Sequence, residues 1–212
     1  MGLLPKLKAY AESLLQEAQQ IPDERKALLQ QLADYLVQSK STPVKLNFIC
    51  THNSRRSHIA QIWADAGAAY FGIPGVQTYS GGTEATAFNP RAVAALQRAG
   101  FQIHNPGGEN PHYQVAFAET HAPLICYSKT FDAPVNPQSG FAAIMTCSDA
   151  DENCPFIPGA AFRLPLTYDD PKVADGTPEE TTRYDERVRQ IGREILYAMQ
   201  LYAIRSGLRH RS

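Results

Sequence analysis

The segment from Cys50 to Ser57 carries residues that can act on an oxyanion. It reads Cys-Thr-His-Asn-Ser-Arg-Arg-Ser, so five residues separate Cys50 from Arg56. A short apolar run ends at Cys50 and a helical pattern begins at Ser57, which predicts a loop leading from a strand into a helix. The backbone N–H groups of such a loop and the positive end of the helix attract an anion, and Arg56 adds a planar, bidentate clamp. The predicted oxyanion-binding residues are Thr51, His52, Asn53, Ser54, Arg55 and Arg56.

Cys50 is the predicted nucleophile of this loop. The field that attracts the oxyanion also favours the thiolate form of Cys50 near neutral pH, and the thiolate is the reactive form of cysteine. For an isolated Cys-x5-Arg motif, the alternative is a buried cysteine that only ends a strand. The position of Cys50 at a strand-to-helix junction, near the start of an alternating region, favours catalysis.

A second pair of thiols, Cys147 and Cys154, lies in the segment Met-Thr-Cys-Ser-Asp-Ala-Asp-Glu-Asn-Cys. We expect a polar loop here, which can rearrange to bring the two Cα atoms to the ~5.5 Å separation that a disulfide requires. A calcium loop is disfavoured because Cys154 replaces its turn glycine and Ala160 its last glutamate. A zinc site lacks the short cysteine spacing and a second pair of ligands. We therefore expect no metal and no cofactor, and interpret Cys126 as a buried core residue.

Strand-like and helix-like patterns alternate from residue 44 onward. Helices are expected over residues 57–71, 90–100 and 178–204, and Asn89-Pro90 starts the second of them. This alternation predicts an α/β domain whose parallel sheet is covered on both faces, with ligands at the carboxyl ends of the strands. The expected strands cover residues 44–49, 76–79, 123–127, 141–146 and 162–166.

Residues 1–43 form a predicted helical hairpin extension, followed by a catalytic domain over residues 44–212. Two leucine-rich helical patterns are separated by Pro22. Their apolar stripes pack either on the main domain or on a second copy of the chain. The second alternative predicts a homodimer through the N-terminal helices.

Composition excludes several classes of protein. The 212 residues carry 20 Lys plus Arg against 21 Asp plus Glu, so the electrostatic case for binding nucleic acid or a membrane surface is absent. No stretch reaches the roughly 18 to 20 apolar residues of a membrane span. The N-terminal residues lack a signal-peptide pattern, and four cysteines are too few for a disulfide scaffold, so we expect reduced thiols and a cytoplasmic protein.

The loop and the cysteine pair resemble the low-molecular-weight protein tyrosine phosphatase fold family, and more closely its thioredoxin-coupled arsenate reductases. The resemblance covers about residues 46–203 and implies a parallel four-stranded sheet flanked by helices. By this resemblance Cys50 is the nucleophile, Arg56 binds the oxyanion, Ser57 stabilises the thiolate, and Asn53 holds the shape of the loop.

Two further roles follow from the resemblance. The reductases carry a nearly identical Cys-Ser-Asp-Ala-Asp segment whose two cysteines form a redox relay, which implies that role for Cys147 and Cys154. Tyr168-Asp169-Asp170-Pro171 resembles their Asp-Asp-Pro segment, and this implies that Asp170 is the general acid. A surface turn is the alternative for this segment taken alone.

The function implied is reduction of arsenate to arsenite, with electrons from a thioredoxin-like thiol partner. The alternatives are a phosphatase acting on phosphotyrosine or a small phosphate ester, and a non-catalytic oxyanion sensor or interaction protein. A phosphotyrosine substrate is disfavoured because Lys172 and Val173 stand where the phosphatases have tyrosines.

Other positions depart from the family pattern. His52 stands where the loop usually has glycine, so it is strained if its φ is positive. Residues 127–140 form an insert with no counterpart in the small reductases. His58 and the remaining histidines are expected at the surface or at helix caps.

Overall fold

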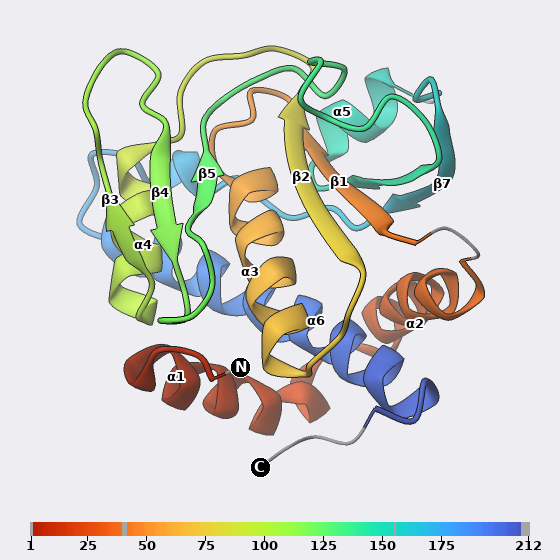
Figure 1. Cartoon of the computed structure of the whole chain (residues 1–212). Helices are drawn as coiled ribbons and strands as arrows, with labels where there is room; N and C mark the ends of the chain where they lie inside the picture. Colours follow the sequence, from red (N-terminus) through yellow and green to blue (C-terminus); the bar gives the residue numbers. More distant parts are fainter. Residues whose placement is uncertain (1, 40–41, 155, 209–212) are drawn as a thin grey trace.

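The computed structural model of the chain describes residues 2–39, 42–154 and 156–208 (Figure 1). Residue 1 of the predicted extension, residues 40–41 before the catalytic domain, residue 155, and residues 209–212 at the end of that domain lie outside the described part. The helices are α1 (Pro5–Gln16), η1 (Ala18–Gln20), α2 (Asp23–Gln38), α3 (Arg56–Tyr70), α4 (Pro90–Ala99), α5 (Ser148–Asn153), η2 (Pro171–Ala174) and α6 (Glu180–Arg205). The strands are β1 (Val44–Cys50), β2 (Val76–Gly82), β3 (Gln102–His104), β4 (Tyr113–Ala116), β5 (Leu124–Cys126), β6 (Phe141–Met145) and β7 (Ala160–Pro165).

The central sheet has four parallel strands in the order β2-β1-β6-β7, which confirms the predicted fold class. Cys50 is paired with Gly82 of β2, and Ile49 with Met145 of β6. The carboxyl ends of β1, β2 and β6 therefore meet at one edge of the sheet, and Cys50 lies at the middle of that edge.

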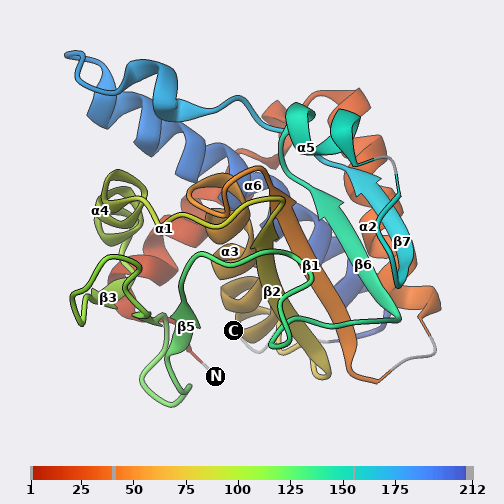
Figure 2. The ribbon, with the colours of Figure 1, turned by 90° about the horizontal axis from the view of Figure 1, so that it is seen from above.

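Each face of the sheet packs into its own apolar cluster, because successive side chains of a strand point to opposite faces. Phe48 and Ile144 belong to the larger cluster, which α3 and α6 close. Ile49 and Met145 belong to a smaller cluster on the other face, against which Phe131 packs. Figure 2 shows the segment after β5 crossing over β2 and β1 toward β6. The insert thus helps to cover the face that the larger helices leave open.

The expected strand at residues 123–127 does not join the parallel sheet. Its described part, β5, pairs antiparallel with β4, and β4 pairs antiparallel with β3. The seven residues between β4 and β5 are too few for the crossover of a dozen or more residues that a parallel neighbour needs. A short connection of this kind permits only an antiparallel hairpin, so the prediction was wrong for this strand.

The N-terminal helices pack on α6 of the same chain (Figure 1). Pro5 occupies the first turn of α1, and Asp23 and Glu24 lie in the first turn of α2, where acidic side chains oppose the helix dipole. The leucines of both apolar stripes are fully buried or nearly so, and they are Leu7, Leu14, Leu29, Leu32 and Leu36. These stripes therefore pack on α6 of the same chain, and a homodimer through the N-terminal helices stays a prediction.

No helix among the described residues is long and apolar enough to cross a membrane.

Candidate active site

Cys50 ends β1 and is held from the first turn of α3. It is buried, and its Sγ atom lies 3.0 Å from Oγ of Ser57. Asn53 in turn donates from Nδ2 to Oγ of Ser57 at 2.9 Å, and its Oδ1 accepts the backbone N–H of Lys129 at 3.0 Å. Since Ser57 accepts from Asn53, its own hydroxyl proton is free to point at Cys50. A hydrogen bond of this kind stabilises a thiolate.

The carbonyl groups of the loop after Cys50 are bonded away from its interior. The backbone N–H groups of Thr83, Glu84 and Asn89 donate to the carbonyls of residues 50, 51 and 54 at 3.1, 2.8 and 2.8 Å. The carbonyl of His52 accepts from Oγ of Ser128 at 2.9 Å. In a trans peptide the N–H group points opposite to the carbonyl. The N–H groups that follow these carbonyls therefore turn toward the inside of the loop, where together they form a concavity that suits an anion.

Asn53, not His52, carries the unusual backbone conformation. Its φ is 44°, and it is the one non-glycine residue with positive φ in the described chain. Asparagine tolerates this region better than most residues because its side chain bonds locally, here to Ser57. The strain expected at His52 is absent.

Gly82 brings β2 into close contact with the loop, a role that the sequence analysis missed. A Cβ atom at this position would lie 2.6 Å from the carbonyl oxygen of Thr51 and 2.7 Å from the backbone nitrogen of Asn53. A glycine pair at the end of a predicted strand is a signal of close backbone approach, and Gly81-Gly82 provides it.

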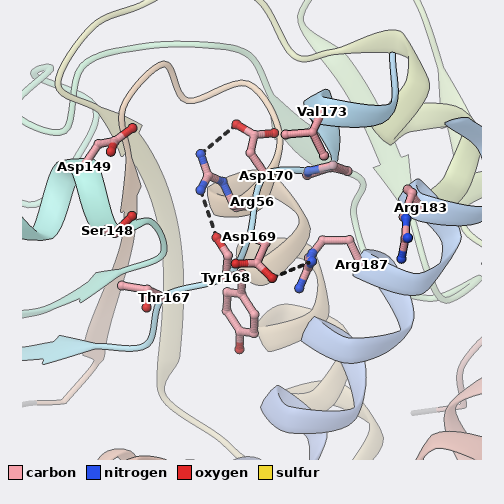
Figure 3. Close-up of a pocket in the computed structure, with 11 residues that line it drawn as sticks. Arg56, Ser148, Asp149, Thr167, Tyr168, Asp169, Asp170, Val173, Arg183 and Arg187 are labelled. Atoms are coloured by element: carbon pink, nitrogen blue, oxygen red, sulfur yellow. Dashed lines mark hydrogen bonds and ion pairs between the residues drawn. The ribbon is translucent and has the colours of Figure 1, made fainter. Parts of the chain in front are cut away.

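Arg56 and Asp170 form an ion pair beside the loop. Nη2 of Arg56 lies 2.7 Å from Oδ2 of Asp170, and Nη1 donates to the carbonyl of Tyr168 at 2.9 Å (Figure 3). The side chain of Asp169 is almost fully exposed, and its Oδ2 atom lies 3.5 Å from Nη2 of Arg187. Of the two adjacent carboxylates, the structure places Asp170 beside the loop.

Arg55 is engaged by side chains outside the loop. Its Nε donates to the hydroxyl of Tyr184 at 2.9 Å, and its Nη2 lies 3.5 Å from Asp175. Burial and a hydrogen bond to Asp175 raise the pKa of Tyr184 to about 12, so this phenol remains a neutral partner. The guanidinium of Arg55 therefore joins the loop to α6 and to the end of η2, and neither faces solvent nor duplicates the clamp of Arg56.

Cys147 lies next to the loop, whereas Cys154 lies at the far end of a short helix. Sγ of Cys147 is 3.4 Å from Oγ1 of Thr51 and is fully buried. It also caps α5 by accepting the N–H of Ala150. We expected a polar loop here, but the aspartates that suggested it lie in the first turn of α5, where they favour the helix.

α5 separates the two thiols of the predicted relay. Seven positions of near-helical chain correspond to about 10 Å. A disulfide allows at most about 7 Å between Cα atoms. Cys147 and Cys154 are both free thiols, and α5 must unwind before they can be joined.

His58 and Cys126 are buried and uncharged. His58 was expected at the surface or at a cap, but its ring is fully buried, stacks on Phe88, and meets Oγ of Ser80 at 3.2 Å. Burial holds the pKa of His58 well below its usual value, so the imidazole is neutral. Burial likewise raises the pKa of Cys126 to about 12, which agrees with its interpretation as an inert core thiol.

A cavity of about 640 Å³ lies beside the loop (Figure 3). Arg56 lines it together with both carboxylates, Asp169 and Asp170. Helix α6 contributes Arg183 and Arg187, and Ser148 borders the cavity at the start of α5. The cavity thus lies between the predicted clamp and acid and the start of α5, the helix that Cys147 and Cys154 flank. No group of three or more His, Cys, Asp or Glu side chains in the described residues is placed to hold a metal ion.

Comparison with known proteins places these features in one family. No family model matches the chain. An arsenate reductase of Bacillus subtilis is 32% identical over 149 residues, which are 70% of this chain and 89% of the relative. An arsenate reductase of Bacillus licheniformis is 33% identical over the same share of each chain.

Solved structures are similar at lower identity. A low-molecular-weight phosphotyrosine phosphatase of Vibrio cholerae has a TM-score of 0.48 and 14% identity, over 73% of this chain and 93% of its own. A thioredoxin-dependent arsenate reductase of Corynebacterium glutamicum has a TM-score of 0.42 and 22% identity, over 84% of this chain and 71% of its own. On the identity and coverage shared with the Bacillus proteins, the chain belongs to the arsenate reductase family.

Proposed function

We propose that the protein reduces arsenate to arsenite at the loop that begins with Cys50. The observation that carries this proposal is the 3.4 Å contact between Thr51 and the Sγ atom of Cys147. A phosphate-ester hydrolase needs one thiol at its oxyanion loop, whereas a thiol-based reductase needs a second one within reach. Membership of the arsenate reductase family supports the same substrate.

The proposed reaction transfers two electrons from thiols to arsenic. The Cys50 thiolate attacks As(V) and displaces one oxygen as water, which forms a Cys50–arsenic adduct. Cys147 then attacks Sγ of Cys50. A Cys50–Cys147 disulfide forms, and the electron pair of the broken S–As bond leaves with arsenic as As(III) arsenite.

Arg56 and Asp170 assist the first step. The bidentate guanidinium of Arg56 holds two oxygens of the bound oxyanion, which requires it to turn from Asp170 toward the loop. Asp170, freed from the ion pair, takes up a proton from the arriving oxyanion or from water and donates it to the departing oxygen. The backbone N–H groups of residues 51–56 bind the remaining oxygens, and Ser57 stabilises the Cys50 thiolate.

Cys154 completes the cycle. It attacks Cys147, so that Cys50 is released as a thiol and a Cys147–Cys154 disulfide forms. This step requires α5 to unwind, and the unwound segment carries the disulfide to a dithiol partner. We propose a thioredoxin-like reductant for that role, which fits a cytoplasmic protein.

The deciding experiment measures arsenate-dependent NADPH oxidation with thioredoxin and thioredoxin reductase, next to hydrolysis of p-nitrophenyl phosphate. We expect the wild-type protein to reduce arsenate and the Cys50→Ser variant to lose both activities. Cys126→Ala is the matched control, because Cys126 is an equally buried thiol that contributes no step. Wild-type protein that consumes no NADPH with arsenate would overturn the reductase.

A phosphatase is the second candidate. The cavity of about 640 Å³ has room for an organic group attached to the oxyanion, and Asp170 lines it. Ester hydrolysis without arsenate reduction in the same assay would favour this function, and Cys147→Ser would then leave the activity intact.

A further inference from the structure

We propose that Arg25, in the N-terminal extension, is a positioning residue for the segment that carries Asp170. This inference rests on the proposed role of Asp170 as the general acid. It gives the extension a part in the reaction, although its helices lie outside the α/β domain and contribute no group to the loop.

Arg25 reaches from the first turns of α2 to residues 167 and 168. Its Nη1 donates to the carbonyl of Thr167 at 3.0 Å, and its guanidinium lies 4.8 Å from the centre of the Tyr168 ring. On its other edge, Nη2 lies 2.5 Å and Nε 3.2 Å from the same carboxylate oxygen of Glu194 on α6. One guanidinium therefore ties the extension, α6 and the acid-bearing segment together.

Arg56 holds the same segment from the opposite side, through the carbonyl of Tyr168 and the carboxylate of Asp170. The two arginines thus bind the consecutive carbonyls of residues 167 and 168. When Arg56 turns to the oxyanion, its bond to Asp170 is lost. The contacts that remain on the segment include those of Arg25 and the bond from the Tyr168 N–H to the carbonyl of Thr146, 3.1 Å long. They also include the ion pairs of Arg55 with Asp170 at 3.8 Å and of Arg187 with Asp169 at 3.5 Å. Of all these contacts, only that of Arg25 comes from the extension.

The two contacts at position 25, to Glu194 and to the carbonyl of Thr167, require an arginine. Glu194 is 1% exposed at its side chain, so it needs a cationic partner, which a lysine can also provide. Lysine lacks the planar fork that binds the Glu194 carboxylate with one edge and the Thr167 carbonyl with another. Arg25→Lys therefore keeps the charge beside Glu194 and removes the hold on the segment.

The test compares two esters that depend differently on a general acid. Phenyl phosphate has a poor leaving group and needs protonation, whereas p-nitrophenyl phosphate needs it little. We expect Arg25→Lys to lower the ratio of kcat on phenyl phosphate to kcat on p-nitrophenyl phosphate by about tenfold, because a misplaced acid loses part of its 10²- to 10⁴-fold effect. The double variant Arg25→Met with Glu194→Met leaves no unpaired buried charge, and it should lower the ratio equally.

Arg189→Lys is the matched control. Arg189 also joins the N-terminal region to α6, through Glu17, but it does not contact residues 167–170. We expect a change in melting temperature like that of Arg25→Lys and an unchanged ratio. On an Asp170→Asn background, Arg25→Lys should have no further effect on the ratio, because the two residues act on one step.

The outcomes separate the two proposals. If Asp170→Asn lowers the ratio and Arg25→Lys does not, only the positioning role is overturned. It is equally overturned if the effect of Arg25→Lys persists without Asp170. If Asp170→Asn leaves the ratio unchanged, the acid assignment fails and the role of Arg25 fails with it. Should the wild type hydrolyse neither ester, the rate of first arsenite release in a single turnover replaces the ratio in the same comparisons.

Discussion

Nη2 of Arg56 and Oδ2 of Asp170 are 2.7 Å apart, so the proposed oxyanion clamp and the proposed acid bind each other. The pair is partly buried, since the Arg56 side chain is 9% and the Asp170 side chain 28% exposed. On the proposed mechanism, an arriving oxyanion competes with Asp170 for the guanidinium, so binding of the substrate and release of the acid become one event.

Asp170→Asn is expected to reduce kcat on phenyl phosphate by about 10²-fold or more, and on p-nitrophenyl phosphate much less, because a general acid typically contributes 10²- to 10⁴-fold. Oxyanion affinity should rise slightly, since Arg56 loses its charged competitor. Steady-state rates and phosphate inhibition constants measure both effects. Asp169→Asn is the control, because this carboxylate is exposed and faces Arg187. A larger loss of kcat in the Asp169 variant would show that Asp169, not Asp170, is the general acid.

Cys147→Ser and Cys154→Ser should each abolish multiple-turnover arsenate reduction and leave ester hydrolysis largely intact. Without Cys154, one equivalent of arsenite should form and a Cys50–Cys147 disulfide should accumulate, because no thiol can resolve it. Peptide mapping under non-reducing conditions identifies the trapped pair.

With all cysteines present and no reductant, the trapped species should instead be Cys147–Cys154. Circular dichroism should then show loss of helix, because the two ends of α5 cannot meet while the helix is intact. Serine variants that reduce arsenate at the wild-type rate would rule out the relay.

Gly82→Ala should disrupt the loop at a distance from the chemistry. The added methyl group would meet the carbonyl oxygen of Glu84 and the backbone of Thr51 and Asn53, so both the loop and the chain after β2 would have to move. We expect a cost of about 1–3 kcal/mol in unfolding free energy, as for other overpacked sites, together with loss of phosphate binding by calorimetry. Gly192→Ala clashes with Trp63 instead, so it should lower stability while phosphate binding persists.

His58 makes the stability of the protein depend on pH. Burial holds its pKa in the folded protein well below the value of about 6.5 expected for the unfolded chain. As the pH falls below about 6.5, the unfolded state takes up a proton that the folded state does not. The free energy of unfolding should then fall by about 1.4 kcal/mol per pH unit from this residue.

The measurement is urea unfolding of the wild type and of His58→Gln between pH 7.5 and pH 5, values chosen to bracket the unfolded-state pKa of about 6.5. As the pH falls, the free energy of unfolding of the wild type should decrease relative to that of His58→Gln. A difference that is constant with pH would show that His58 has the same pKa in the folded and unfolded states.

The sequence predicted the parallel sheet and the place of Cys50 because local patterns carry that information. An apolar run ending at Cys50, a helix starting near Ser57, and the Asn89-Pro90 cap each depend on neighbouring residues alone. The cap is present as expected, with the Asn89 side chain accepting the N–H of Arg91. Strand pairing across the sheet then follows from the alternation of elements.

Contacts between segments distant in the sequence were not predictable in this way. The burial of His58 depends on Phe88 and Ser80, and the grip of Arg25 on Thr167 joins residues 142 positions apart. The antiparallel pairing of β5 depended on the length of a connection rather than on the residues of the strand. Helix α5 was mistaken for a loop because aspartate-rich segments suit both a turn and a first helical turn.

The outward bonds of the loop carbonyls have a consequence for the kinetics of binding. Residues 83–89 and Ser128 fix these carbonyls when the chain folds, so the proposed anion-binding concavity exists before any ligand arrives. Little conformational entropy is then lost when the oxyanion enters. On the proposed mechanism, entry of the oxyanion requires the separation of one ion pair, Arg56–Asp170, and no ordering of the loop.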